Sequence, residues 1–214
     1  MHPLIAQVTG VVWHNGERNA DFTLDLEKAI DNIEKKQSPL VFITTPNNPT
    51  GNAINIRAIE LLAIAVGKYG GLLVVDEAYA EFSSEKSAVT LIGTYPHIIT
   101  IRTMSKAFAF AGARVGYMVA HPIVIDAMRI VRLPYHLSAI TQAAALTALE
   151  YKEELLAKVG ALITAREKVA EAIVALGLKV IPSSANFLLF TGFKKSSEES
   201  VSYTHLRAHE TRED

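Results

Sequence analysis

Three short apolar runs constrain the fold of this chain more than any other feature of its sequence. They are LVFITT (40–45), LLVVDEAY (72–79) and IITIRTM (98–104), and the segments between them are long enough for crossover connections. Apolar residues fill successive positions of these runs, as is typical of parallel strands that are covered on both faces. The alternation of strand and helix patterns predicts an α/β fold with a mostly parallel central sheet and helices on both faces.

The segment between the first two runs has the pattern of a crossover helix. Within INIRAIELLAIAVGKYG (54–70), apolar residues recur at helical spacing from Ile56 to Val66. Gly70 and Gly71 then provide a stop before the next strand. A helix at this place makes a right-handed βαβ unit the expected connection.

The C-terminal half is expected to be helical before it returns to strand character. A further strand pattern, GYMVA (116–120), precedes three helical segments, and the last of these, residues 153–177, is long enough to link two domains. LKVIPSSANFLLF (178–190) then has the pattern of strands. We therefore expect a large domain over residues 1–150, followed over residues 151–193 by a linking helix and the start of a small C-terminal domain.

Residues 194–214 differ from everything before them. They lose apolar periodicity and become polar and charged, a composition that does not support a packed core. The last part resembles the peptide that results when sequencing-adapter DNA is translated. We expect this tail to be non-native or disordered, and reading the source DNA past codon 193 tests that expectation.

Composition narrows the classes of function. The formal net charge is −1 and the basic residues are scattered, which argues against a nucleic-acid or anionic-membrane partner. The chain has no cysteine, which excludes disulfides, thiolate metal sites and a cysteine nucleophile. His205 and His209 lie in the tail without a third ligand, so no metal site is expected. The first residues are not typical of a secretion signal, and no stretch approaches the ~20 apolar residues of a membrane span, so we expect a cytoplasmic protein.

Polar groups follow each of the three apolar runs. They are PNNPTG (46–51), DEAY (76–79) and TMSK (103–106), and the carboxyl ends of parallel strands are where open α/β sheets bind ligands. Each group is weak evidence alone, because PNNPTG also reads as a tight turn and a single lysine is usually solvated. Asp76 is more informative, since a buried carboxylate needs a partner. Together they indicate one ligand site at this edge.

The chemistry of these side chains matches the ring of pyridoxal phosphate. A carboxylate such as Asp76 would keep the pyridine nitrogen protonated, which makes the ring an electron sink. Tyr79 and Asn48 would hydrogen-bond the ring 3′-oxygen.

The remaining side chains match the aldehyde and the phosphate of the same cofactor. The amine of Lys106 would attach to the cofactor, made nucleophilic by desolvation and by the neighbouring charge of Arg114. The hydroxyls of Thr103 and Ser105 and the guanidinium of Arg114 would hold the phosphate, for which a planar fork of donors is well suited.

PNNPTG, VVDEAYAEF and TMSKAFAFAGARVGY, in this order, resemble the central motifs of fold type I aminotransferases, specifically the histidinol-phosphate aminotransferase branch. LPYHLSAITQAAALTAL (133–149) and SSANFLLF (183–190) are similar to later segments of that branch. The resemblance implies transamination between glutamate and imidazole-acetol phosphate, giving L-histidinol phosphate in histidine biosynthesis. It also implies that Lys106 moves the proton between substrate and cofactor, and that the intact protein is a homodimer.

The family's chain is longer than this one. Its Gly-containing phosphate loop, its ring-stacking aromatic residue and a tyrosine that reaches the partner subunit would precede Met1, and its substrate-carboxylate arginine would follow Phe193. We therefore expect a fragment truncated at both ends, with weak cofactor binding and poor or absent catalysis.

Other functions remain open at this point. An aromatic-amino-acid aminotransferase and a phosphothreonine decarboxylase share the same motifs, because cofactor residues do not determine the substrate. Outside this chemistry, the alternatives are a non-catalytic truncated product and an α/β module in which Lys106 and Arg114 bind an anionic ligand. The phosphate-binding motifs G-x-x-x-x-G-K-[ST] and G-x-G-x-x-G are absent from the sequence, which argues against the common forms of such a module.

Overall fold

The computed structural model describes residues 2–193, so the prediction for the tail (194–214) falls outside the described residues. At its centre lies a sheet with the strand order β1-β2-β3-β4. The first three strands are parallel, and β4 runs antiparallel to β3. The strands are β1 (Leu40–Thr44), β2 (Leu72–Asp76), β3 (Ile98–Thr103) and β4 (Gly116–Ala120). The predicted α/β fold with a mostly parallel sheet is confirmed.

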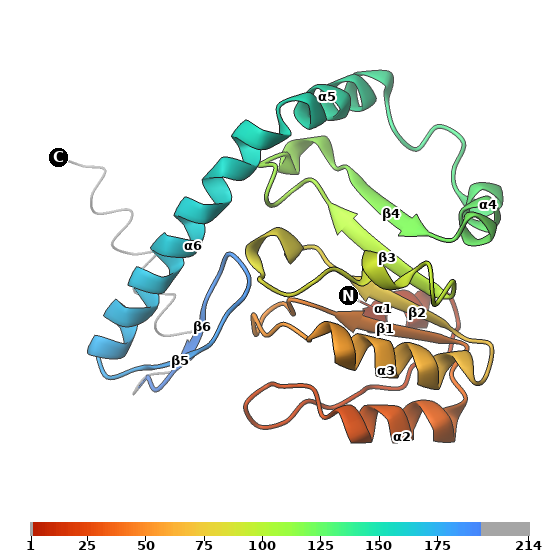
Figure 1. Cartoon of the computed structure of the whole chain (residues 1–214), viewed down its shortest axis with the longest axis horizontal. Coiled ribbons are helices and arrows are strands. Elements are labelled where there is room, and N and C mark those ends of the chain that lie inside the picture. Colours follow the sequence, from red (N-terminus) through yellow and green to blue (C-terminus); the bar gives the residue numbers. More distant parts are fainter. Residues whose placement is uncertain (1, 194–214) are drawn as a thin grey trace.

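Helices α2 (Leu26–Lys36) and α3 (Ile56–Gly67) lie one beyond the other on one face of the sheet (Figure 1). Asp25 and Asn55 cap their N-termini, because each side chain accepts a hydrogen bond from a backbone N–H in the first turn. Helix α3 connects β1 to β2 and is the crossover helix that the sequence predicted. Gly70 follows it with a φ of +66°, a conformation that glycine adopts without strain. Helix α1 (His2–Val8) lies behind the sheet in this view.

The face under α3 contains the main hydrophobic core. Because paired residues of neighbouring strands point to the same side, the register of β1, β2 and β3 brings one apolar row from each strand against α3. This core includes Val41, Ile43, Ile59, Leu62, Val66, Leu73, Val75 and Ile98. It holds the sheet as a rigid support for the loops that follow its strands.

The opposite face of the same strands ends in polar side chains. Thr44 of β1 pairs with Asp76 of β2, and Asp76 pairs with Ile101 of β3. Side chains alternate along a strand, so Thr103 points to the same side as Ile101 and Asp76. Ile101 and Leu40 on this face are exposed. The carboxyl end of this face therefore presents polar groups beside an open surface.

The C-terminal half is built from three helices and a hairpin. Helix α6 runs from the end of α5 down one side of the molecule to β5 (Figure 1). Gly177 follows α6 with a φ of +79°, in the position expected for a helix-ending glycine. The elements are α4 (Pro122–Val131), α5 (Ala139–Glu150), α6 (Lys152–Ala175), β5 (Lys179–Ile181) and β6 (Leu189–Thr191).

A second group of buried residues, here called the carboxyl-end cluster, lies between the loops after β2 and β3 and helix α6. It comprises Tyr79, Phe82, Met104, Ala107, Phe108, Val115, Val159 and Ala185. Three short 3₁₀ helices belong to the same loops, η1 (Ala80–Phe82), η2 (Ala88–Leu91) and η3 (Ala111–Ala113). This cluster anchors the loops that carry the predicted site residues.

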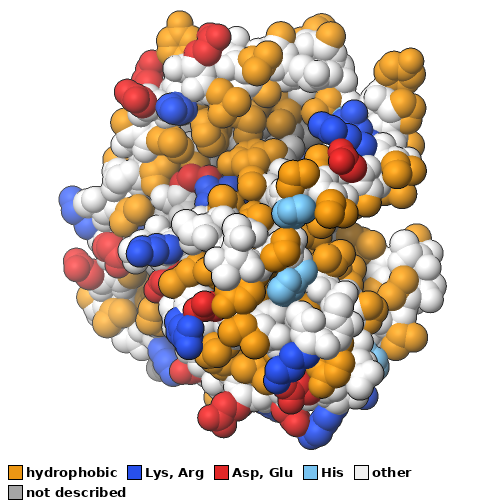
Figure 2. Space-filling model, turned by 45° about the vertical axis from the view of Figure 1, so that its right-hand side comes forward, with side chains coloured by type: hydrophobic (Ala, Val, Ile, Leu, Met, Phe, Trp, Pro, Cys, Tyr) orange, Lys and Arg blue, Asp and Glu red, His pale blue; other side chains and the backbone are white. Residues whose placement is uncertain are grey.

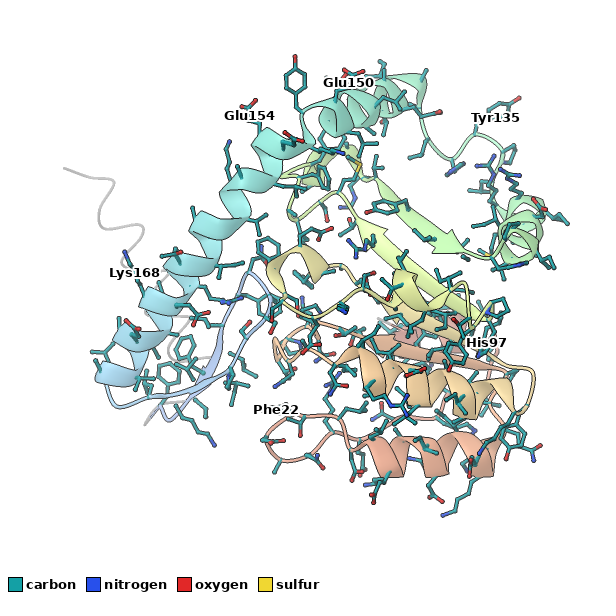
Figure 3. The ribbon with its side chains drawn as sticks, viewed as in Figure 1. Phe22, His97, Tyr135, Glu150, Glu154 and Lys168 are labelled. Atoms are coloured by element: carbon teal, nitrogen blue, oxygen red, sulfur yellow. The ribbon has the colours of Figure 1, made fainter. Side chains whose placement is uncertain are left out.

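Helices α4 and α5 contain no buried residue, although both are apolar in sequence. Hydrophobic side chains consequently reach the surface over much of the face drawn in Figure 2. Tyr135, in the connection between α4 and α5, is 96% exposed and points outward (Figure 3). In the part of the chain that the structure describes, no helix combines the length and the apolar composition needed to cross a membrane.

Candidate active site

The predicted site residues follow the carboxyl ends of β1, β2 and β3. Arg114 precedes β4, and because β4 is antiparallel to β3, the start of β4 lies at the same edge: Thr103 pairs with Gly116. A Cβ on Gly116 would come within 2.8 Å of the Arg102 carbonyl oxygen, so glycine allows the two strands to approach at this point. The topology therefore brings the three polar segments of the sequence and Arg114 to one edge of the sheet.

Asn48 and Tyr79 are joined directly. The Asn48 side-chain amide donates a hydrogen bond of 2.9 Å to the Tyr79 hydroxyl, which links the turn after β1 to the turn after β2. Within the first of these turns, Asn47 donates to the Thr50 hydroxyl at 2.8 Å, and the Thr45 hydroxyl accepts from the backbone N–H of Ile54 at 2.8 Å. The PNNPTG segment is thus a tight turn, and it also places Asn48 against the phenol.

Lys106 lies over the ring of Tyr79. Its Nζ is 5.3 Å from the ring centroid, within the range of a cation–π contact. The side chain is exposed, so the expected desolvation of its amine is wrong for this structure. Tyr79 itself is buried in the carboxyl-end cluster and meets Phe187 edge to face, with ring centroids 5.1 Å apart. The phenol therefore has a fixed position between the amide of Asn48 and the amine of Lys106.

Thr103 and Ser105 form a second joined pair. Their hydroxyl oxygens are 2.8 Å apart, and the backbone N–H of Ser105 donates to the Thr103 hydroxyl at 3.2 Å. Arg114 is exposed, has a left-handed φ of 55°, and donates from Nη1 to the Ala111 carbonyl at 3.4 Å. Among the contacts of the described residues, none joins Arg114 to Thr103, Ser105 or Lys106. Its place at a phosphate remains a prediction.

Asp76 is half-buried at the end of β2. One of its carboxylate oxygens accepts a hydrogen bond of 3.1 Å from the backbone N–H of Ala78, which shapes the turn toward Tyr79. The carboxylate lies on the open face of the sheet, on the same side as Thr44 and Thr103. A cationic group of a ligand at this edge would find an anion there.

Sequence reasoning missed a buried ion network beside these residues. Glu77, which is 2% exposed, accepts hydrogen bonds from Arg102 Nε (3.0 Å) and Nη2 (2.7 Å), and Glu81 accepts from Arg102 Nη1 (3.1 Å). Burial alone would lower the pKa of Arg102, but the charge of Glu77, its hydrogen bonds and the charge of Glu81 outweigh this and leave the pKa raised. The sequence does contain a signal for this network. Glu77, just after β2, and Arg102, within β3, are charged residues at positions where the alternation along the strand points the side chain to the buried face.

The structure also joins this edge to the segment after β5. The backbone N–H of Ser184 donates to the Gly51 carbonyl at 2.8 Å, and Arg166 of α6 donates to the Ala185 carbonyl at 2.7 Å. Together with Phe187 on Tyr79, these contacts bring the SSANF segment against the predicted site. No local pattern in the sequence indicates that the two segments touch.

Comparison with known proteins identifies the family. The family model described as aminotransferase class I and II matches residues 1–210. The chain belongs to this family. The histidinol-phosphate aminotransferase of Thermobifida fusca is 48% identical to it over 208 residues, which make up 96% of this chain and 55% of the relative. The chain spans about half the length of the curated relatives that it matches.

Solved aminotransferase structures have the same arrangement of elements. The histidinol-phosphate aminotransferase of Sinorhizobium meliloti, solved in complex with pyridoxal-5′-phosphate, aligns with a TM-score of 0.80 and 28% identity over 88% of this chain and 51% of that chain. The aspartate aminotransferase of Thermus thermophilus, solved with maleate, aligns with a TM-score of 0.77 and 30% identity over 88% of this chain and 52% of that one. Aminotransferases named for different substrates thus share this fold, and the fold alone does not specify the substrate.

Proposed function

We propose that this chain carries the pyridoxal-phosphate site of an aminotransferase, and that the intact protein is a histidinol-phosphate aminotransferase. The observation that carries the proposal is the placement of the Lys106 amine over Tyr79, whose hydroxyl is already held by Asn48. An amine, a phenol and an amide converge at a sheet edge that also presents Asp76. The family membership and the 48% identity to a named histidinol-phosphate aminotransferase support the same conclusion.

The donor set fits the groups that pyridoxal phosphate presents. Asp76 supplies an anion for the pyridine nitrogen, while Asn48 and Tyr79 supply hydrogen-bond donors for the ring 3′-oxygen. The phosphate would be held by Thr103, Ser105 and Arg114. When bound, the cofactor supplies an electron-withdrawing ring that stabilises negative charge at the substrate α-carbon.

Lys106 is the acid and base of the proposed reaction. Its exposed amine would hold the cofactor through the aldehyde carbon. The same amine, when free, would accept a proton from the substrate α-carbon and give it back, so that one side chain would act first as base and then as acid. The contact with Tyr79 holds Nζ 5.3 Å from the centre of the phenol ring.

The relatives support a specific exchange. The intact protein would transfer an amino group between glutamate and imidazole-acetol phosphate, giving L-histidinol phosphate. An aromatic-amino-acid aminotransferase and a phosphothreonine decarboxylase are less well supported, because the curated relatives at 48–50% identity are named histidinol-phosphate aminotransferases. The family also supports small amino-acid and keto-acid substrates, a homodimer and a cytoplasmic location for the intact protein. The division into residues 1–150 and 151–193 is part of the same proposal.

Covalent attachment at a single lysine tests the proposal. Wild-type chain incubated with pyridoxal phosphate should gain an absorbance near the edge of the visible range, and borohydride should fix the cofactor on Lys106, as peptide mass mapping would show. Lys106→Ala should lose both signals, whereas Lys168→Ala, which removes an exposed lysine of α6, should keep them. Equal labelling of Lys106→Ala and wild type would overturn the assignment. Amino-donor and keto-acceptor assays on the full-length gene product would then test the substrate.

A further inference from the structure

Glu77 and Arg102 form a buried ion pair that none of the proposed cofactor contacts uses. The side chains of Glu77 and Arg102 are 3% and 18% exposed. The guanidinium donates from Nε and Nη2 to one oxygen of Glu77, Oε2, and a lysine cannot place two donors in this fixed planar arrangement. Its Nη1 binds Glu81, whose other carboxylate oxygen is buried without a hydrogen-bond partner among the described residues.

The ion pair lies directly behind the predicted site. Glu77 follows Asp76 in the chain and Arg102 precedes Thr103, while the backbone N–H of Glu77 donates to the Ile101 carbonyl at 2.9 Å. Neighbouring side chains point to opposite faces of a sheet. Glu77 and Arg102 therefore project toward the α3 side at the position where Asp76 and Thr103 project toward the site.

Arg102 holds the turn that carries Tyr79 at both of its ends. Glu77 begins this turn and Glu81 lies two residues beyond Tyr79, so a single guanidinium on β3 binds both sides of it. Glu77 also accepts hydrogen bonds from the Ser87 hydroxyl (2.7 Å) and the backbone N–H of Ala88 (2.6 Å). The carboxylate is thus fixed by β3 on one side and by the start of η2 on the other.

We propose that Arg102 is a positioning residue: through Glu77 and Glu81 it fixes the turn that carries Tyr79, and with it Asp76 just before the turn, relative to the strand end that leads to Lys106. The assignment to a cofactor site rests on the proposed function. A buried ion pair often contributes no more stability than an apolar pair of similar volume. Here its directional contacts join β3 to both ends of the turn. One Glu81 oxygen is buried without a hydrogen-bond partner in the described part of the chain, which costs stability. This agrees with an ion network that positions the turn more than it stabilises the fold.

The test separates local placement from overall stability. Arg102→Met removes the guanidinium, and Arg102→Lys keeps the charge without the paired donors. Arg57→Met is the matched control, because it breaks an ion pair with Glu60 on α3 in which the arginine is 69% exposed. We expect both Arg102 variants to bind pyridoxal phosphate more weakly and to be fixed on Lys106 by borohydride more slowly, by ~10-fold or more for Arg102→Met. Without cofactor, backbone amides in residues 77–81 should exchange hydrogen faster by a similar factor, and those of α3 should be unchanged.

The outcomes distinguish this inference from the proposed function. If the folded Arg102 variants match wild type in amide exchange over residues 77–81 and in cofactor affinity, the positioning role is overturned, even if their unfolding midpoint falls. If Arg102→Met does not fold, the same two measurements on Arg102→Lys decide. If wild type fails to be labelled on Lys106, the proposed function fails, and amide exchange alone decides whether Arg102 positions the turn.

Discussion

Helix α3 and the pair α4 and α5 are all apolar in sequence, but the structure buries only α3. Leu62 of α3 is 1% exposed, whereas Ile130 of α4 is 84% exposed. Helix α3 lies between the sheet and α2, with apolar residues of both packed against it. Helix α5 instead turns the small side chains of Ala145 and Ala148 toward the carboxyl-end cluster and leaves Leu146 outward.

Apolar periodicity in a sequence indicates a helix, but it does not indicate which elements pack against that helix. A buried position needs a second surface, and α3 has two, because β2 lies on one side of it and α2 on the other. Helices α4 and α5 have the composition of buried helices without such surfaces among the described residues. Substitutions at closely packed positions and at open ones should therefore differ in their effect on stability.

Truncation of a leucine should separate the two regions most clearly. Leu62→Ala in α3 should lower the free energy of unfolding by about 2–5 kcal/mol, because it leaves a cavity in the main core. Leu146→Ala in α5 makes the same chemical change at a position that is 64% exposed. This variant should alter the free energy of unfolding by no more than about 0.5 kcal/mol. Urea unfolding of both variants measures this. Equal losses would mean that α5 is packed as tightly as α3.

A glycine substitution tests the contact between the PNNPTG turn and the segment after β5. Gly51 has a φ of +78°, and a Cβ there would meet Ser183 Oγ at 2.3 Å, so Gly51→Ala should cost about 1–3 kcal/mol. Gly112 has no atom within 4 Å of the corresponding position, and Gly112→Ala should be close to neutral. Urea unfolding midpoints compare the two. A neutral Gly51→Ala would show that the segment after β5 does not rest on the PNNPTG turn.

A polar substitution on α4 should change the surface and not the stability. Ile130→Asn should shift the free energy of unfolding by less than about 0.5 kcal/mol, because the side chain it replaces is already in water. It should also reduce the fluorescence of a dye that binds exposed apolar surface. A loss of stability as large as that of Leu62→Ala would contradict the exposure of α4.

The smallest expected effect concerns pH. Hydrogen bonds from Arg57 and then from Tyr95 lower the pKa of Glu60 on α3 below its usual value of 4.5. The carboxylate therefore stabilises the folded chain above pH 4.5, and this contribution is lost as the pH falls through the lowered pKa. Glu60→Gln should flatten the decline of stability on the acid side, measured by urea unfolding at about pH 6 and about pH 3. An unchanged acid slope would show that these contacts are not formed in solution.

Much of the fold could be predicted because it depends on local patterns. The apolar runs located β1, β2 and β3, and the spacing from Ile56 to Val66 with Gly70 after it located α3. Helix α2 was not predicted, although Asp25 and an apolar residue every three or four positions mark it in the sequence. The antiparallel direction of β4 could not be predicted, because side-chain alternation is the same in both strand directions.

The candidate site was only partly visible in the sequence. Clusters at strand ends indicated Asn48, Tyr79 and Lys106, and the structure brings these three together. The pairing of Glu77 with Arg102 needed the register between β2 and β3, which no local pattern contains. Arg114 adopts the left-handed backbone conformation although it is not a glycine, and no local pattern in the sequence indicates this.

Asp76 and Glu77 are adjacent carboxylates that point to opposite faces at the end of β2. This arrangement limits which insertions and deletions the gene can tolerate. Deleting or inserting a single codon within β2 would exchange the two faces. Asp76 would then point toward the ion network, and Glu77 would point toward the proposed site. Changes of length are therefore expected to accumulate in the loops at the amino ends of the strands, while the strands themselves diverge by substitution alone.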